Sequence, residues 1–165
     1  MDVFDNINEK WYNSTGVITD GSHLVNGKLE PNVKYKSGEF DYIYLTDDSG
    51  RIARVHVEEL QYTERDYRER HNPNTLGKQQ GDHAGHLIAD RFGGSPDIDN
   101  LVSQSALVNL SEYKKMENIW ANALNNGQKV SVDIKVQYIG DGMRPSGFTV
   151  NYFVDGSKVN QYIEN

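Results

Sequence analysis

The clearest pattern in the chain is an alternation of apolar and polar residues around its first third. The runs 40–45 and 52–57 both alternate side chains between two faces, which is the period of a half-buried β-strand. The turn-forming residues Asp47-Asp48-Ser49-Gly50 separate them. This arrangement predicts a β-hairpin, which we expect to serve as scaffold.

The same alternation returns in the last third of the chain. It predicts a meander of antiparallel strands, because the connections are too short for parallel crossovers. The expected strands are 129–138, 148–154 and 159–163. A shorter strand is expected at Val33–Tyr35. Trp11, Tyr12 and Val17–Ile18 are expected to form either one short strand or a cover over an edge of the sheet.

One segment, about 106–125, has apolar residues at steps of three and four, which is the period of an amphipathic helix. Ser103 or Ser105 is a suitable N-cap. Gly127 is suited to end the helix in a left-handed conformation. The patterns together predict an α+β fold, in which an antiparallel sheet carries one main long helix.

Between the hairpin and the helix, residues 81–94 concentrate two histidines, two aspartates, one arginine and four glycines. The apolar run Leu87–Ala89 predicts a short buried strand that ends at Asp90. The pair Gly93–Gly94 predicts a turn. On this interpretation His86 lies where a flexible segment enters a buried strand, a place that holds an imidazole with one side open.

The span 62–81 is the most charged and least apolar part of the chain. Its first half, Glu64–Arg70, predicts a short helix with solvated charges, and the remainder predicts a loop. The span is interpreted either as a surface linker or as a basic patch beside the histidine-rich window. The patch would comprise Arg65, Arg68, Arg70 and Lys78.

Composition narrows the class of protein. A length of 165 residues predicts a single domain, 1–165, with a core motif at 81–126. Ten tyrosines argue against disorder, and the lack of cysteine excludes disulfides and thiolate chemistry. No apolar run approaches membrane-spanning length and no signal-peptide pattern opens the chain, so we expect no membrane contact. Excision from a longer protein, or another export route, is then expected.

The net charge of −7 argues against binding to nucleic acid, because phosphate contacts normally favour basic proteins. A bound divalent cation would reverse the field locally. An acidic total also fits a non-catalytic module that binds a protein or mimics DNA, and this alternative stays open.

His83 and His86 are spaced closely enough to suggest a transition-metal site, since imidazole binds zinc, copper and nickel. Paired histidines are more often structural or solvent-facing. The chain has no cysteine and no His-Glu-x-x-His motif, so the sequence does not favour a structural zinc site.

A set of residues in and after this window resembles the DNA/RNA non-specific endonuclease family. The set is Gly85-His86-Leu87-Ile88-Ala89 followed by Asn100, Gln104, Asn109, Tyr113 and Glu117. The resemblance is to the bacterial polymorphic-toxin branch, within the His-Me finger, or ββα-metal, nucleases, and it covers mainly 81–118. It implies an antiparallel sheet with a ββα-metal core.

The family signature Asp-Arg-Gly-His is only partly present. The glycine and His86 match, but His83 stands in place of the aspartate and Ala84 in place of the arginine. In relatives that arginine contacts phosphate. Arg91, or an arginine within Arg65–Arg70, would have to replace it here, and Arg91 is counted among the implied catalytic residues.

The resemblance assigns roles to the remaining residues. His86 would be the general base that deprotonates water, and its ordinary pKa of about 6.5 suits that role. Asn109 would bind Mg²⁺, a hard cation that keeps several waters, with Mn²⁺ as a substitute. Glu117, two helical turns later, would act on the metal through water. His83 and Gln104 would support the site or the substrate.

The implied reaction is metal-dependent hydrolysis of phosphodiester bonds with little sequence preference, in DNA and, as an open alternative, RNA. The resemblance also implies the C-terminal toxin domain of a larger exported bacterial protein, which is secreted or delivered into target cells and neutralised by a cognate immunity protein. A secreted scavenging nuclease is an alternative, as is the non-catalytic acidic module.

Overall fold

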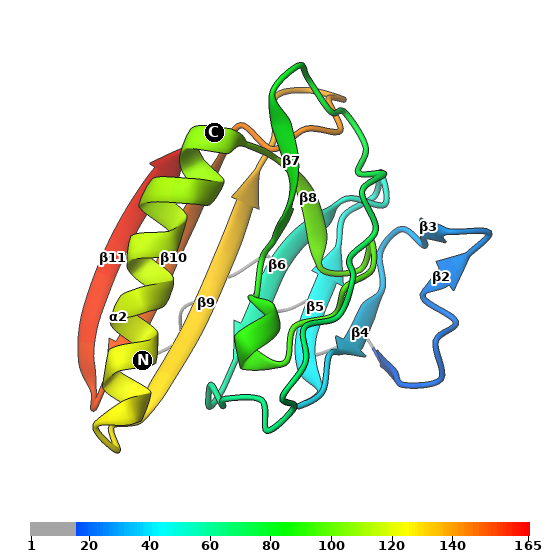
Figure 1. Ribbon diagram of the computed structural model, residues 1–165. Coiled ribbons are helices and arrows are strands. Elements are labelled where there is room, and N and C mark those ends of the chain that lie inside the picture. Colours follow the sequence, from blue (N-terminus) through cyan, green and yellow to red (C-terminus); the bar gives the residue numbers. More distant parts are fainter. Residues whose placement is uncertain (1–15) are drawn as a thin grey trace.

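A computed structural model describes residues 16–165 (Figure 1). Its largest element is a seven-stranded sheet of order β1-β4-β5-β6-β9-β10-β11. Neighbouring strands are antiparallel except for the parallel pair β1 and β4. The strands are β1 (Val17–Ile18), β4 (Lys34–Ser37), β5 (Tyr42–Thr46), β6 (Ile52–Val57), β9 (Val130–Gln137), β10 (Gly147–Val154) and β11 (Ser157–Glu164).

Two small antiparallel pairs complete the β structure. One pairs β2 (Leu24–Val25) with β3 (Lys28–Leu29), and the other pairs β7 (Asp82–His86) with β8 (Leu101–Ser105). The β7–β8 pair lies beside the same face of the large sheet that carries the helix (Figure 1). This pair and the helix together form a ββα unit.

The predicted hairpin and meander are both confirmed, as β5–β6 and β9–β10–β11. Tyr44 and Val55 are opposite each other in the hairpin and are both fully buried, which is the burial that the alternation predicted. The strand at 17–18 is confirmed, and the one expected at 33–35 begins one residue later, as β4. Trp11 and Tyr12 lie outside the described residues.

The predicted long helix is confirmed, with a wider π-helical turn, η2 (Val108–Glu112), before α2 (Tyr113–Asn125). Ser105 is the capping serine, because its Oγ accepts a hydrogen bond of 3.1 Å from the amide of Val108. The helix crosses one face of the sheet over β9, β10 and β11 (Figure 1). None of the helices within residues 16–165 is long and apolar enough to cross a membrane.

Aromatic side chains fix the helix on the sheet. Trp120 packs edge-on against Tyr152, with ring centroids 5.6 Å apart, and Tyr113 packs in the same way against Phe148, also at 5.6 Å. The hydroxyl of Tyr113 donates a 2.8 Å hydrogen bond to the carbonyl oxygen of Leu87. The helix is thereby held both to the large sheet and to the segment that follows β7.

The strand predicted at Leu87–Ala89 is wrong, because the strand precedes this run and ends at His86. The apolar residues leave the ladder and enter the core, where Leu87 and Ile88 are fully buried. The side chain of Asn100 replaces a neighbouring strand there. Its Oδ1 accepts from the Ile88 amide at 3.0 Å, and its Nδ2 donates to the Ile88 carbonyl at 2.8 Å. The turn predicted at Gly93–Gly94 is present, with Gly93 at φ 78°.

The helix predicted at Glu64–Arg70 is also wrong, since this segment has no regular structure. Hydrogen bonds fix the path of the chain where it enters this segment. The amide of Thr63 donates to the carbonyl of Arg91 at 2.9 Å, and the hydroxyl of Thr63 accepts from the amide of Arg65 at 3.1 Å. These contacts hold the backbone as an irregular loop against the segment after β7.

Candidate active site

The candidate site residues lie on the ββα unit. His83 and His86 lie on β7, Asn109 lies in the π-helical turn and Glu117 lies on α2. The capping bond of Ser105 links the end of β8 directly to the helix start. The local fold therefore sets how the helix residues face the strand that carries the histidines.

One hydrogen bond joins the strand and the helix at this site. The side-chain nitrogen Nδ2 of Asn109 lies 3.0 Å from Nδ1 of His83. With Nδ2 as donor, the His83 ring carries its proton on Nε2. The amide of Asn109 is thereby oriented, and no protein partner of its oxygen is found within residues 16–165. An oriented, unengaged amide oxygen is a suitable ligand for a hard cation.

The imidazole of His86 is half-buried at the end of β7. Its Nε2 is buried and has no hydrogen-bond partner within residues 16–165. Burial, reinforced by the electrostatic influence of His71 and Arg68, lowers the pKa of His86 to about 4, and the carboxylate of Asp90 opposes this shift. The ring is therefore neutral at physiological pH and able to accept a proton.

The carboxyl group of Glu117 is also partly buried. Burial raises its pKa to about 7, while the nearby cations Arg91, Lys114 and Arg68 act in the opposite direction. In the protein without a bound cation this carboxyl group is thus close to half-protonated at neutral pH. A nearby divalent cation would favour its ionised form.

Two arginines lie near these groups. The guanidinium of Arg91 donates to Oδ1 of Asn118 at 2.8 Å and lies over the ring of Phe92, 5.2 Å from the ring centroid. The charge of Arg68 acts on both His86 and Glu117, and its side chain is exposed. Both therefore contribute positive charge beside the candidate site.

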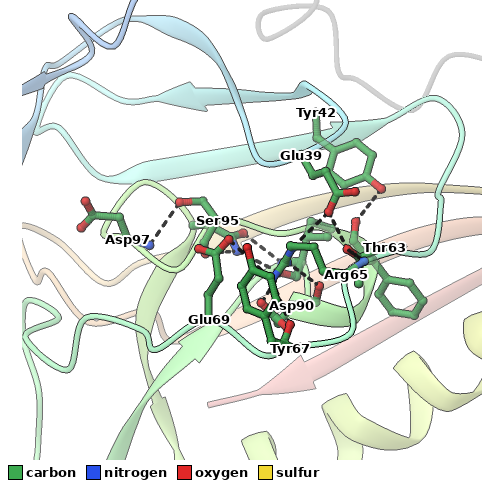
Figure 2. Close-up of polar contacts among 12 residues, drawn as sticks. Glu39, Tyr42, Thr63, Arg65, Tyr67, Glu69, Asp90, Ser95 and Asp97 are labelled. Atoms are coloured by element: carbon green, nitrogen blue, oxygen red, sulfur yellow. Dashed lines mark hydrogen bonds and ion pairs between the residues drawn. The ribbon is translucent and has the colours of Figure 1, made fainter.

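The predicted basic patch is wrong in respect of Arg65, which is paired with three carboxylates. Its guanidinium contacts Glu39 at 3.3 Å, Asp90 at 3.2 Å and Glu69 at 3.5 Å (Figure 2). Lys78 donates to the carbonyl of Pro73 at 2.8 Å. Because Arg65 links the loop to Asp90, it is a structural anchor rather than a candidate for phosphate binding.

Gln104 is fully buried and lies behind β7, opposite His83 in the ladder. A Cβ on Gly85 would lie 2.7 Å from both Cβ and Cδ of Gln104, and nearer still to its Oε1. The glycine before His86 is therefore required by the packing of Gln104. Gln104 supports the strand from inside and does not reach the surface where a substrate would lie.

The sequence analysis missed His71. Its ring packs edge-to-face against that of His86, with centroids 5.1 Å apart and an interplanar angle of 69°. The two residues are distant in sequence, and the loop of His71 has no period, so no sequence signal brings them together. Among residues 16–165 no group of three or more histidine, cysteine, aspartate or glutamate side chains is arranged to hold a metal ion.

Comparison with family models and with known proteins identifies a family and several relatives. A model of the DNA/RNA non-specific endonuclease family matches residues 31–156. The type VII secretion system protein EssD of Staphylococcus aureus (strain USA300) is 39% identical over 140 residues, and the strain Newman protein matches equally. The match covers 79% of this chain but only 22% of EssD, so the chain spans about a fifth of these relatives.

Solved structures with the same fold are nucleases. NucA from Streptococcus agalactiae with magnesium bound has a TM-score of 0.65 at 20% identity, over 86% of this chain and 76% of NucA. The zinc-bound Sda1 nuclease has a TM-score of 0.55 at 14% identity, over 74% of each chain. At these identities the similarity concerns the fold, an α+β sheet with one long helix. The family match to 31–156 carries the assignment: the chain belongs to the DNA/RNA non-specific endonuclease family.

Proposed function

We propose that the chain is a metal-dependent endonuclease in which His86 is the general base and Asn109 the metal ligand. The observation that carries the proposal is the bond between Asn109 and His83, which leaves an oriented amide oxygen on the helix next to the strand of His86. We infer that DNA is the substrate, with RNA as an open alternative, and that cleavage has little sequence preference, since the matching family is one of non-specific DNA/RNA endonucleases.

The base would act through Nδ1 of His86. Since Nε2 is buried and unpartnered within the described chain, Nδ1 is the nitrogen that a water molecule can reach. A neutral ring accepts the proton of the attacking water as the phosphodiester bond is broken. The pKa of about 4 keeps this ring unprotonated over the whole physiological range.

Magnesium fits the residues present, with Mn²⁺ as a substitute. Asn109 would supply one oxygen ligand, and Glu117 would accept hydrogen bonds from metal-bound water. When bound, the cation would neutralise charge on the scissile phosphate and on the leaving oxygen. Arg68 and Arg91 would hold the phosphates on either side, in place of the arginine that the family has at the position of Ala84.

Cleavage of supercoiled plasmid by the purified protein, with and without EDTA, tests the proposal. His86→Ala should lower the rate by about 10²–10⁴-fold, the usual contribution of a general base. Asn109→Ala should abolish the response to added Mg²⁺, whereas Asn122→Ala, an exposed asparagine on the same helix, should behave as wild type. Wild-type cleavage by His86→Ala would refute the base. EDTA-insensitive cleavage would refute the metal, and absence of cleavage would favour the acidic binding module.

We further propose that the chain is the toxin segment of a longer secreted protein, as its identity to part of EssD suggests. A cognate immunity protein would then protect the producing cell. Expression in a bacterial cytoplasm should be toxic for the wild type and harmless for His86→Ala at equal protein level. Co-expression of the candidate immunity gene, taken as the neighbour of the gene that encodes this chain, should restore growth. Failure to restore growth would favour a scavenging nuclease.

A further inference from the structure

The second imidazole beside His86 has no role in the reaction described above. A catalytic histidine is usually oriented by a hydrogen bond on the nitrogen that does not react. Here Nε2 of His86 has no such partner within residues 16–165, although it is buried. The orientation of the ring must therefore come from packing, and the ring packed edge-to-face against it belongs to His71.

We propose that His71 is a positioning residue, whose ring holds the imidazole of His86 so that Nδ1 faces the substrate. This inference rests on the proposed role of His86 as the base. The geometry is that of a favourable aromatic pair, with centroids 5.1 Å apart and planes at 69°. Packing on an aromatic edge fixes a ring without adding an acceptor that would favour its protonated form.

The loop that carries His71 is fixed firmly enough for this role. The amide of Asn72 donates to the carbonyl of Pro96 at 2.8 Å. Further along, the hydroxyls of Thr75 and Ser103 are 2.8 Å apart, and Ser103 donates to the carbonyl of Leu76 at 2.7 Å. Because Ser103 lies on β8, the loop is tied to the partner strand of β7, and His71 moves with the strand pair that carries His86.

The charges around His86 are consistent with a base held neutral by its surroundings. His71 and Arg68 on the loop disfavour the protonated ring, and Asp90 after β7 favours it. Removing His71 would open the ring of His86 to water and would also remove one of the two neighbouring groups that disfavour its protonated form. Both changes raise the pKa of His86 toward its ordinary value of about 6.5.

Two variants distinguish a packing role of the His71 ring from a chemical role of its nitrogen atoms. His71→Ala removes the ring, so kcat for a short duplex should fall by about 10–100-fold with a smaller change in KM. The acidic limb of the pH–rate profile should also move to higher pH. His71→Phe keeps the ring but no nitrogen, and should restore kcat to within about threefold of wild type. Tyr67→Ala, an exposed aromatic on the same loop, is the matched control and should leave both unchanged.

NMR titration of the His86 ring provides a readout that does not depend on turnover. Its pKa should rise in His71→Ala and rise less in His71→Phe. Equal loss of kcat in both variants would overturn the proposal, because a nitrogen of His71 would then be needed. Wild-type kcat and titration in both variants would overturn it as well. An inactive His86→Ala combined with an unaffected His71→Ala would refute this inference alone, whereas an active His86→Ala would refute the proposed function.

Discussion

The contact between Gly85 and Gln104 makes a quantitative prediction about the strand that carries the catalytic histidine. In Gly85→Ala the new methyl group would lie 2.7 Å from two carbons of Gln104. Gln104 is fully buried, so its side chain cannot swing into solvent. Either β7 shifts or the amide is forced into another part of the core. Overpacking of this kind costs about 1–3 kcal/mol.

The same displacement would reach the active site, because Gly85 directly precedes His86. A misplacement of about 1 Å is enough to lower catalysis by roughly 10²-fold. We therefore expect Gly85→Ala to lower the melting temperature by about 3–10 °C, the shift expected for that loss of stability in a chain of this size. We expect it to lower plasmid cleavage far more than the loss of folded protein explains.

A double-mutant cycle tests the cause. Gln104→Ala removes Oε1 and Cδ, two of the three atoms closest to the new methyl group, and leaves the contact with Cβ, so it relieves the overpacking only in part. It also removes two amide atoms that have no partner within residues 16–165, so its cavity cost is partly offset. Gly85→Ala/Gln104→Ala should therefore be less destabilised than the sum of the single variants by about 1–2 kcal/mol, measured by urea unfolding with unchanged m-values. Additive effects, or a neutral Gly85→Ala, would refute this explanation of the glycine.

Two further predictions follow from charged groups near the site. The folded pKa of Glu117, about 7, exceeds its ordinary value of 4.5, so ionising this carboxyl costs stability as the pH rises from about 4.5 to 7. Without metal at pH 8, Glu117→Gln should thus be about 1–3 kcal/mol more stable than wild type, whereas its cleavage activity should fall. Thermal melts at pH 5 and pH 8 test this, and an equal difference in stability between the two proteins at both pH values would refute it. Asp82→Asn breaks a two-pronged ion pair of 2.7 and 3.0 Å between the start of β7 and Arg144, and should cost about 2–4 kcal/mol. Because Arg144 lowers the pKa of Asp82 below its ordinary value of 3.8, the wild-type advantage should be complete at neutral pH and should shrink only as the pH falls below that value, which urea unfolding at pH 7 and pH 3 would check.

The sequence predicted correctly those elements in which apolar residues repeat with the period of the strand or helix itself. The alternation around Tyr44 and Val55 reported a half-buried strand because those two side chains are fully buried opposite each other. The helix at 106–125 was predictable from the spacing of its apolar residues, but its buried face is formed by Tyr113, Met116 and Trp120, whereas Leu107 and Leu110 are exposed. The spacing of the apolar residues did not predict the wider π-helical turn at Val108–Glu112.

The run Leu87–Ala89 shows where such reasoning fails. Its apolar residues correctly indicated burial, but burial does not specify which groups satisfy the backbone. Here an asparagine side chain, Asn100, bonds both the amide and the carbonyl of Ile88, so the segment is buried without being a strand. The contact between His71 and His86 could not be predicted for a different reason. His71 lies on a loop whose sequence has no periodic pattern, so nothing in the sequence places it beside the strand of His86.

The net charge of −7 appeared to argue against a substrate made of phosphates, and the structure gives a physical answer for part of it. The acidic residues Glu39, Glu69 and Asp90 are all in contact with Arg65 beside the loop, and its positive charge offsets part of their negative charge there. At Glu117 the nearby cations are Arg68, Arg91 and Lys114. Electrostatic attraction to phosphate is screened over about 8–10 Å at physiological salt, so these local cations count for more at the site than the total does.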